Sequence, residues 1–179
     1  MEFLGNEIGG RFFPTERIFD GMLMFTFGVG EDISFELEMA RMGVRCICFD
    51  PTPKSIQYMK QYPHIEFKPW GLFHKSMQKR FYYPKDPNHV SCSIGNLQGT
   101  TEWFKARCIT LEVATEKFGI PDIVKMDIEG AEYKVIDNFQ FWPEILMVEF
   151  HGNKEKQYAD YLALQYGTVH KDNHDYLAL

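Results

Sequence analysis

The feature that most constrains the fold is an alternation of short apolar runs with stretches that carry apolar residues at helical spacing. The apolar runs are residues 22–27, 44–49, 65–68, 105–109, 122–126 and 145–150. The helical stretches are residues 34–42, 52–62, 110–118, 131–139 and 154–165. Buried strands that alternate with amphipathic helices form βαβ units. The sequence therefore predicts an α/β fold, with a mostly parallel sheet and helices on both faces.

Other segments depart from this alternation. Residues 80–83 are typical of an edge strand, and residues 167–170 and 176–179 can pair as a final hairpin. Residues 84–101 are rich in Pro, Asn, Ser and Gly, which predicts a long loop that serves as a lid or a substrate loop. Because the chain shows no linker or repeat, we expect a single domain, 1–179, led by an N-terminal segment, 1–20.

The first apolar run ends at Gly28-Val29-Gly30, where a ligand of a parallel sheet is expected, outside the carboxyl ends of the strands. Glycines there allow a tight turn and a close approach of ligand to backbone. A dinucleotide fingerprint has a third glycine, but Ile33 occupies that position. Glu31 and Asp32 place negative charge where a diphosphate would bind, which favours a cationic ligand.

The second and third runs end at residues that suit a nucleoside. Asp50 lies 20 residues after Gly30 and precedes Pro51, so its carboxylate can accept hydrogen bonds from ribose hydroxyls or cap the next helix. Trp70 and Gly71 follow the third run, where Trp70 can lie against an adenine or belong to the core. Glycines, acid and spacing together predict a ligand that contains adenosine.

The later runs end at acids and an imidazole. Asp127 and Glu129 follow the run 122–126, and Glu149 and His151 close the run 145–150. Such groups can hold an ammonium, orient a hydroxyl or take its proton, so Asp127, Glu129 and His151 are the candidate catalytic residues, in no fixed order. Glu129 and Glu132 also suit the first turn of a helix. Asp127, Glu149 and His151 could form a facial metal set, but nothing fixes their geometry, and no metal site is predicted.

Composition narrows the function classes. The formal net charge is -6 and no Lys/Arg run occurs, which argues against a nucleic-acid partner. No apolar run reaches the ~18 residues of a membrane span, and the N-terminus does not resemble a signal peptide. The four cysteines form no CxxC pair and indicate free buried thiols in a reducing compartment. We therefore expect a cytoplasmic protein without a membrane partner.

These motifs together resemble the FkbM family of methyltransferases. The matching pieces are FGVGEDISFE (27–36), FDPTP (49–53), NHVSCS (88–93), KMDIEGAEY (125–133) and VEFH (148–151). Residues 5–10 are similar to the Gly-rich leading segment of that family. The pieces occur in the family's order over most of the chain, and DIEGAE is the most specific of them.

The resemblance implies a Rossmann-like class I fold, with a seven-stranded sheet whose last strand is antiparallel. It also implies the cofactor S-adenosylmethionine and O-methylation of a hydroxyl on a sugar or other small metabolite. By the family pattern, Gly28 and Gly30 approach the methionine part of the cofactor and Asp50 takes the ribose, while Asp127 and Glu129 line the transfer site. The full cofactor-binding set predicted here is Gly28, Val29, Gly30, Asp50, Pro51, Trp70, Gly71 and Asp127.

The sequence does not identify the methyl acceptor or the residues that bind it. The chain is short, so its acceptor pocket must come from the loop 88–97, from the N-terminal segment or from a second subunit of a homo-oligomer. Two other functions fit fewer of the motifs. A nicotinamide-dependent oxidoreductase shares the glycines and Asp50 but lacks the third glycine. A non-catalytic scaffold would use Tyr82, Tyr83 and Trp103 as a partner surface.

Overall fold

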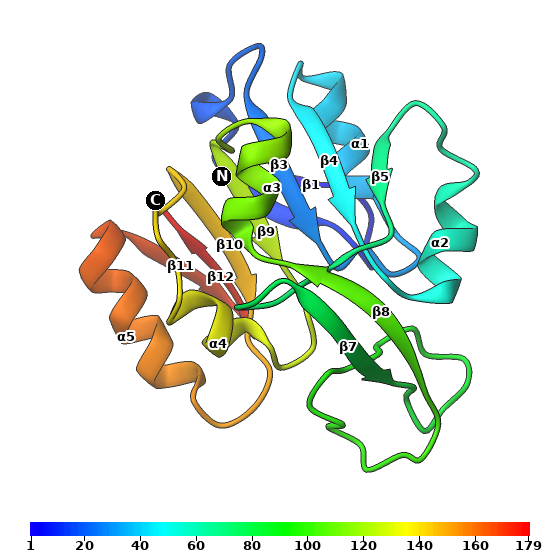
Figure 1. Ribbon diagram of the computed structural model, residues 1–179. Helices are drawn as coiled ribbons and strands as arrows, with labels where there is room; N and C mark the ends of the chain where they lie inside the picture. The colour runs from blue at the N-terminus through cyan, green and yellow to red at the C-terminus, as the bar shows by residue number, and fades with distance from the viewer.

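The computed structural model describes residues 1–179, and a seven-stranded sheet forms its centre (Figure 1). In order across the sheet, the strands are β11 (Val169–Asp172), β12 (Asp175–Ala178), β10 (Ile145–Glu149), β9 (Ile123–Met126), β3 (Leu23–Phe27), β4 (Arg45–Phe49) and β5 (Glu66–Lys68). The pairs from β10 to β5 are parallel, and β12 is antiparallel to both of its neighbours. The predicted mostly parallel sheet, with its last strand antiparallel, is confirmed.

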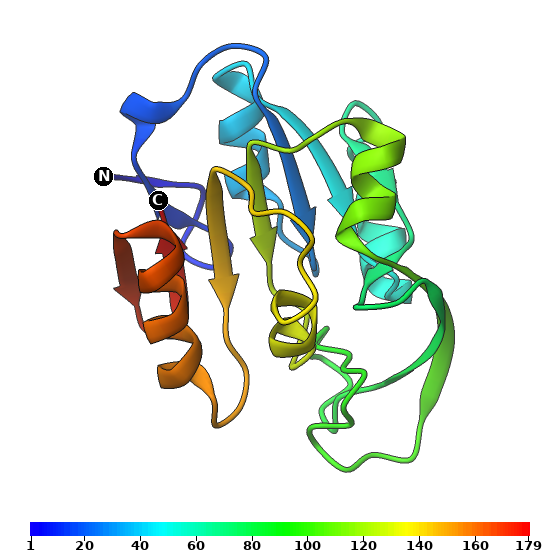
Figure 2. The same ribbon diagram turned by 60° about the vertical axis from the view of Figure 1, so that its left-hand side comes forward.

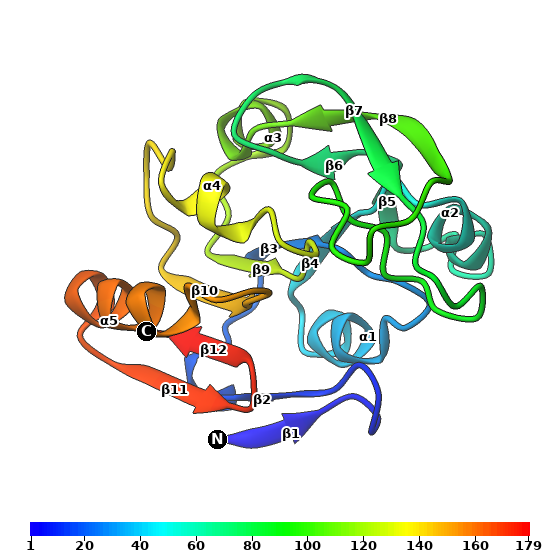
Figure 3. The ribbon, with the colours of Figure 1, turned by 90° about the horizontal axis from the view of Figure 1, so that it is seen from below.

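Five helices pack against this sheet. They are α1 (Ser34–Arg41), α2 (Pro53–Met59), α3 (Leu111–Phe118), α4 (Glu132–Ile136) and α5 (Glu155–Tyr166). Successive side chains of a strand point to opposite faces, and β3 shows this clearly. Phe25 packs in a core cluster with residues of α3, α4 and α5, whereas Met24 packs in a second cluster with Phe35 and Met39 of α1. Figure 3 shows α3 and α4 on one side of β3 and β9, and α1 on the other.

Two helices end earlier than the sequence predicted. Helix α2 ends at Met59 rather than at residue 62, and α4 spans 132–136 rather than 131–139. In both cases the following residues continue as tight turns with hydrogen bonds from residue i+3 to residue i, as between Tyr62 and Met59. None of the five helices is both long and apolar enough to cross a membrane.

A second, three-stranded sheet stands apart from the main one. It contains β6 (Gly71–Leu72), β8 (Trp103–Ile109) and β7 (Met77–Tyr82), in that order. Residues 80–82 of the segment 80–83 belong to β7, which pairs with β8 alone to form a ribbon and is an edge strand of this second sheet, so the predicted edge strand is confirmed. Figure 2 shows this ribbon extending beyond the carboxyl ends of the main strands. It carries the long connection 84–101 over that end of the molecule.

The connection 84–101 contains no helix or strand beyond one bridge between Tyr82 and Ser93, so the predicted long loop is confirmed. Lys54 of α2 donates hydrogen bonds to the carbonyl oxygens of Pro87 and His89, and the Thr100 hydroxyl donates to the carbonyl of Tyr83 at 2.6 Å. The loop is thus anchored at both ends.

A short N-terminal hairpin was not predicted. Its strands are β1 (Glu2–Leu4) and β2 (Arg11–Phe13), joined by a turn in which the Asn6 side chain accepts two backbone N–H groups. Leu4 and Phe13 are buried against α1 and the sheet. The hairpin therefore covers part of the sheet face that α1 leaves open (Figure 3).

All four cysteines are buried and free. Burial raises the pKa of the Cys46 and Cys108 thiols to about 12 and that of Cys92 to about 11. Burial also raises the pKa of Cys48 well above its ordinary value. Free buried thiols were the sequence prediction, and it is confirmed.

Candidate cofactor and transfer site

A cavity of about 520 Å³ lies at the carboxyl ends of β3, β4 and β9. Its volume is within the usual range for a site that encloses a small organic ligand. Most of the predicted site residues line it, namely Gly28, Val29, Gly30, Asp50, Pro51, Gly71, Asp127 and Glu129. The loop 88–94 and residues 8, 9 and 11 of the N-terminal segment form the opposite wall.

Gly28 sits at the closest approach of two strand ends. Its φ is +83°, and an added Cβ would lie 1.8 Å from the carbonyl oxygen of Asp127. Only glycine fits there, because any side chain would collide with backbone. Gly30, with a φ of +55°, has Val90 of the long loop next to it. The glycine turn is thus enclosed between β9 and the loop.

Asp50 holds this turn in place. Its Oδ2 atom accepts hydrogen bonds from the N–H groups of Val29 at 3.0 Å and Gly30 at 3.1 Å. Its Oδ1 atom accepts from the N–H of Thr52 at 2.8 Å, at the start of α2. The side chain therefore ties the glycine turn to that helix. The Oδ1 atom has a further lone pair, and contact of Asp50 with a ribose stays a prediction.

Trp70 lies outside the cavity lining. Its ring packs 6.4 Å from that of Phe49 and 6.1 Å from that of Phe118, with the Arg107 guanidinium 4.7 Å from its centre. The core alternative for Trp70 is therefore the one that the structure supports. Leu72 and Phe81, which the sequence did not single out, supply apolar lining instead.

His151 is surrounded by carboxylates. Its Nδ1 atom lies 3.2 Å from Oε1 of Glu132, and Nε2 lies 3.4 Å from Oε2 of Glu129. Nε2 is also 3.6 Å from Glu149 and 3.9 Å from Asp127. Burial lowers the pKa of His151, but the hydrogen bond to Glu132 and the nearby negative charges raise it overall, to about 9. The imidazole is therefore protonated at neutral pH.

Asp127 and Glu132 each have one buried carboxylate oxygen without a hydrogen bond, and of the two residues only Asp127 lines the cavity. The buried oxygen of Asp127 is Oδ1. Burial and the charge of Glu129 raise the pKa of Asp127 to about 6. Glu129 itself has a φ of +55°, an unusual conformation for a residue other than glycine and one that is often found at functional sites. A hydroxyl or a cation at this point would find an unpaired acceptor.

Donor atoms of Asp127, Glu129 and His151 lie within 4.8 Å of one another. That spacing would also suit a metal ion. The protonated imidazole, however, already places positive charge among these carboxylates. Without a bound ion, the same three residues form an acid–imidazolium cluster.

The sequence profile of the methyltransferase FkbM domain matches residues 23–177. The chain belongs to the FkbM methyltransferase family. No curated protein sequence shows significant similarity to it. A similar solved structure is the C-terminal domain of precorrin-6Y C5,15-methyltransferase from Rhodobacter capsulatus. It is 12% identical with a TM-score of 0.48, and the match covers 90% of this chain and 80% of that chain.

The FkbM domain match begins at the first residue of β3, so the N-terminal hairpin lies outside it. Residues 8, 9 and 11 nevertheless line the cavity of the FkbM domain. Arg11 in particular forms an ion pair with Glu149, 138 residues along the chain. No local sequence pattern marks Arg11, because such a pair exists only through the tertiary fold.

Proposed function

We propose that this FkbM-family protein is an S-adenosylmethionine-dependent methyltransferase that methylates a hydroxyl group on a sugar or other small metabolite. The observation that carries this proposal is the cavity at the carboxyl ends of β3, β4 and β9, which is lined by Asp127, whose buried Oδ1 atom accepts no hydrogen bond. The family match supports methyl transfer as the reaction class.

The cavity residues suit this cofactor. Gly28 and Gly30 present bare backbone, and Asp50 lies at the base of the glycine turn. Glu31 and Asp32 also line the cavity, and their negative charge favours a ligand with ammonium and sulfonium groups over a diphosphate. When bound, S-adenosylmethionine supplies a methyl group whose carbon–sulfur bond breaks, with the electron pair left on sulfur, as the acceptor oxygen bonds to carbon.

The protein's own contribution is positioning and proton handling. Asp127 is the best placed base, because its buried Oδ1 atom accepts no hydrogen bond and can accept the hydroxyl proton, although it lies 3.9 Å from Nε2 of His151. His151 is protonated at neutral pH and therefore serves as a hydrogen-bond donor that orders the acids around it. Of the three candidate catalytic residues, His151 is thus assigned to positioning.

Thermal unfolding with S-adenosylmethionine, S-adenosylhomocysteine or NAD tests the cofactor assignment. A ligand at 100 times its Kd adds about 2.7 kcal/mol of stability, which raises the Tm of a chain this size by roughly 5–10 °C. We expect such a shift with both sulfur ligands and none with NAD. A shift with NAD alone would favour an oxidoreductase, and no shift with either sulfur ligand would reject the proposal.

A variant measured for both cofactor binding and turnover separates a catalytic protein from a non-catalytic scaffold. Asp127→Asn removes the proposed base while keeping the shape of the side chain. We expect the variant to bind S-adenosylhomocysteine and to lose at least about 100-fold in kcat. Equal loss of cofactor binding and turnover would instead assign Asp127 to cofactor binding.

A further inference from the structure

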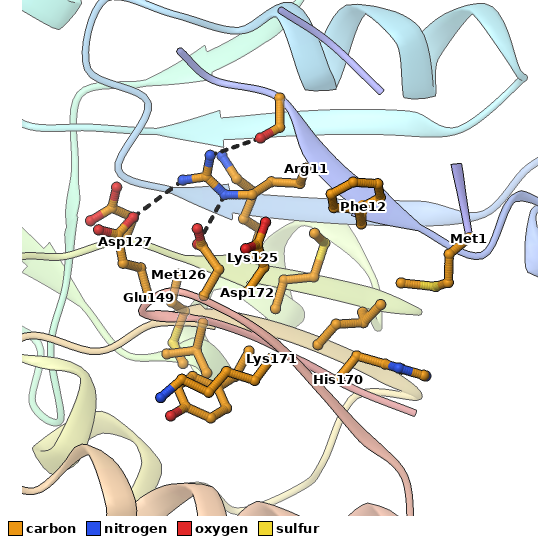
Figure 4. A pocket seen from close by; sticks show the side chains of 16 residues that line it. Met1, Arg11, Phe12, Lys125, Met126, Asp127, Glu149, His170, Lys171 and Asp172 are labelled. Carbon is orange, nitrogen blue, oxygen red and sulfur yellow. Dashed lines mark hydrogen bonds and ion pairs between the residues drawn. The ribbon is translucent and has the colours of Figure 1, made fainter. Parts of the chain in front are cut away.

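A second cavity, of about 360 Å³, adjoins the first (Figure 4). It lies between the N-terminal hairpin and the strands β10, β12 and β11. The two cavities share Arg11, Lys125 and Asp127 in their linings. A molecule in the second cavity would therefore lie against Asp127, which lines both cavities.

The strand register explains what lines this cavity. Lys125, Met147, Leu177 and His170 are direct neighbours on β9, β10, β12 and β11, and form one row across the sheet. Glu149, Asp175 and Asp172 form a second row two residues further along, which Asp127 extends just past the end of β9. Side chains two residues apart on a strand share a face. The first row thus gives the cavity a floor of both polar and apolar side chains. The second row gives it a rim of four carboxylates, those of Asp127, Glu149, Asp172 and Asp175.

Two cations contact that rim. One is His151, which lies 3.6 Å from Glu149 and 3.9 Å from Asp127. The other is Arg11. Arg11 donates to Glu149 at 3.2 Å, pairs with Asp175 at 2.9 Å and donates to the carbonyl of Gly10 at 2.9 Å (Figure 4). Its side chain is only 17% exposed and lines both cavities, so these contacts hold it in the wall between them.

The other lysines of the lining are engaged elsewhere. Lys125 forms a buried ion pair with Glu36 at 3.0 Å. Lys171 pairs with Glu155 of α5 at 2.9 Å, on the other face of the sheet. Four carboxylates against one guanidinium and the imidazolium of His151 still leave the rim with net negative charge, which repels anions and attracts cations.

We propose that this second cavity is the acceptor pocket, and that it selects hydroxyl compounds by charge. It takes a ligand of about one sugar ring, prefers one that carries an ammonium group and rejects one that carries a carboxylate or phosphate. The inference rests on the proposed methyl transfer, because the acceptor must meet the methyl group at Asp127. Part of the pocket's wall comes from the hairpin, outside the matched FkbM domain.

Three probes of one ring type test the charge preference: glucosamine, glucose and glucuronate, which carry a positive, no and a negative charge. Their Kd values are measured by NMR titration at low salt, with the protein saturated by S-adenosylhomocysteine. We expect glucosamine to bind most tightly and glucuronate at least about tenfold more weakly than glucosamine.

A pair of charge-reversal variants locates the effect. Asp172 is exposed at the outer end of the rim and distant in sequence from the transfer residues, so Asp172→Lys reverses one rim charge. Glu116 is an exposed acid of α3, on the opposite face, and Glu116→Lys changes the net charge by the same amount. We expect Asp172→Lys to reduce the glucosamine preference about tenfold and Glu116→Lys to leave it unchanged.

The outcomes separate this inference from the proposed function. If S-adenosylhomocysteine binds but no probe binds, or the three bind alike, the acceptor pocket is wrong while the cofactor assignment stands. An equal effect of both lysine variants would also overturn it, since the preference would then come from overall charge. If S-adenosylhomocysteine does not bind, the proposed function and this inference both fail.

Discussion

The Nδ1 atom of His151 lies 3.2 Å from Oε1 of Glu132, a residue whose side chain is completely buried. The same oxygen accepts hydrogen bonds from the backbone N–H groups of Ile128 and Gly130, each at 3.1 Å. One carboxylate oxygen therefore fixes both the imidazole after β10 and the loop after β9. The first turn of α4 thus sets the geometry of the transfer site.

The pH dependence of stability should report this contact. Because the pKa of His151 is raised from 6.5 to about 9 in the folded protein, its stabilisation is fully present below pH 6.5 and is lost as the pH rises through 9. The whole effect is at most about 3 kcal/mol. In Glu132→Gln the amide oxygen can still accept the backbone hydrogen bonds, but the charge is gone. We expect the variant to lose at least ~1 kcal/mol less than the wild type between pH 6.5 and 9.5.

Urea unfolding of both proteins at the two pH values measures this difference. Other groups that titrate in this range contribute equally to both proteins, so the comparison isolates His151. Parallel stability profiles would show that Glu132 does not raise the pKa of His151.

The pH–rate profile should reveal the proposed base. With a pKa raised to about 6, Asp127 is protonated below that pH and cannot take a proton from the acceptor. We expect kcat/KM, measured with any acceptor that turns over, to fall about tenfold per pH unit below 6 and to level off above it. In Asp127→Asn the residual activity should lose this limb. A limb that persists in the variant would place the base elsewhere.

Gly28→Ala should be among the most damaging single-methyl changes in the chain. The added Cβ would meet the carbonyl oxygen of Asp127 at 1.8 Å, on top of the strain of a φ of +83°. Gly167 has nearly the same φ, +81°, but open space around it, so Gly167→Ala carries the strain without the collision. We expect Gly167→Ala to cost about 1–2 kcal/mol in urea unfolding and Gly28→Ala clearly more. Equal costs would contradict the close approach of β3 and β9.

Methyl transfer should not require a metal ion. The proposed transfer needs positioning of the acceptor and a base, and side chains of the protein can supply both. We expect turnover to be unchanged after dialysis against EDTA and on addition of Mg²⁺ or Mn²⁺. Activity that disappears with EDTA and returns with one of these ions would identify Asp127, Glu129 and His151 as ligands.

Most of the sheet and its cavity could be predicted from the sequence, because buried parallel strands and their following turns leave local signals. The residues after β3, β4 and β9 were identified from the glycines and acids that end each apolar run, and they line one cavity. For Trp70, the position after the third apolar run did not reveal whether its ring faces the cavity or the core. Trp70 directly precedes β6, and its ring turns toward Phe49 and Phe118, while its neighbour Gly71 lines the cavity.

The N-terminal hairpin left no such signal. Its strands have three residues each, which is too short to show an alternation of apolar and polar residues. Packing on α1 and long-range contacts stabilise them instead. Arg11 acquires its role only because β2 lies beside β10 and β12 in the fold. Residues whose partners are more than a hundred positions away cannot be found from spacing along one chain.

Because the four thiols are buried, their reaction with a thiol reagent can measure how the protein opens. Cys46, Cys48 and Cys108 lie on strands, so a thiol reagent reaches them only when the sheets separate, at a rate set by unfolding of the domain. Cys92 instead belongs to the loop 84–101, where a local excursion would uncover it alone. The order in which the four sulfurs are labelled therefore distinguishes a loop that opens as a lid from one that moves only when the whole chain unfolds.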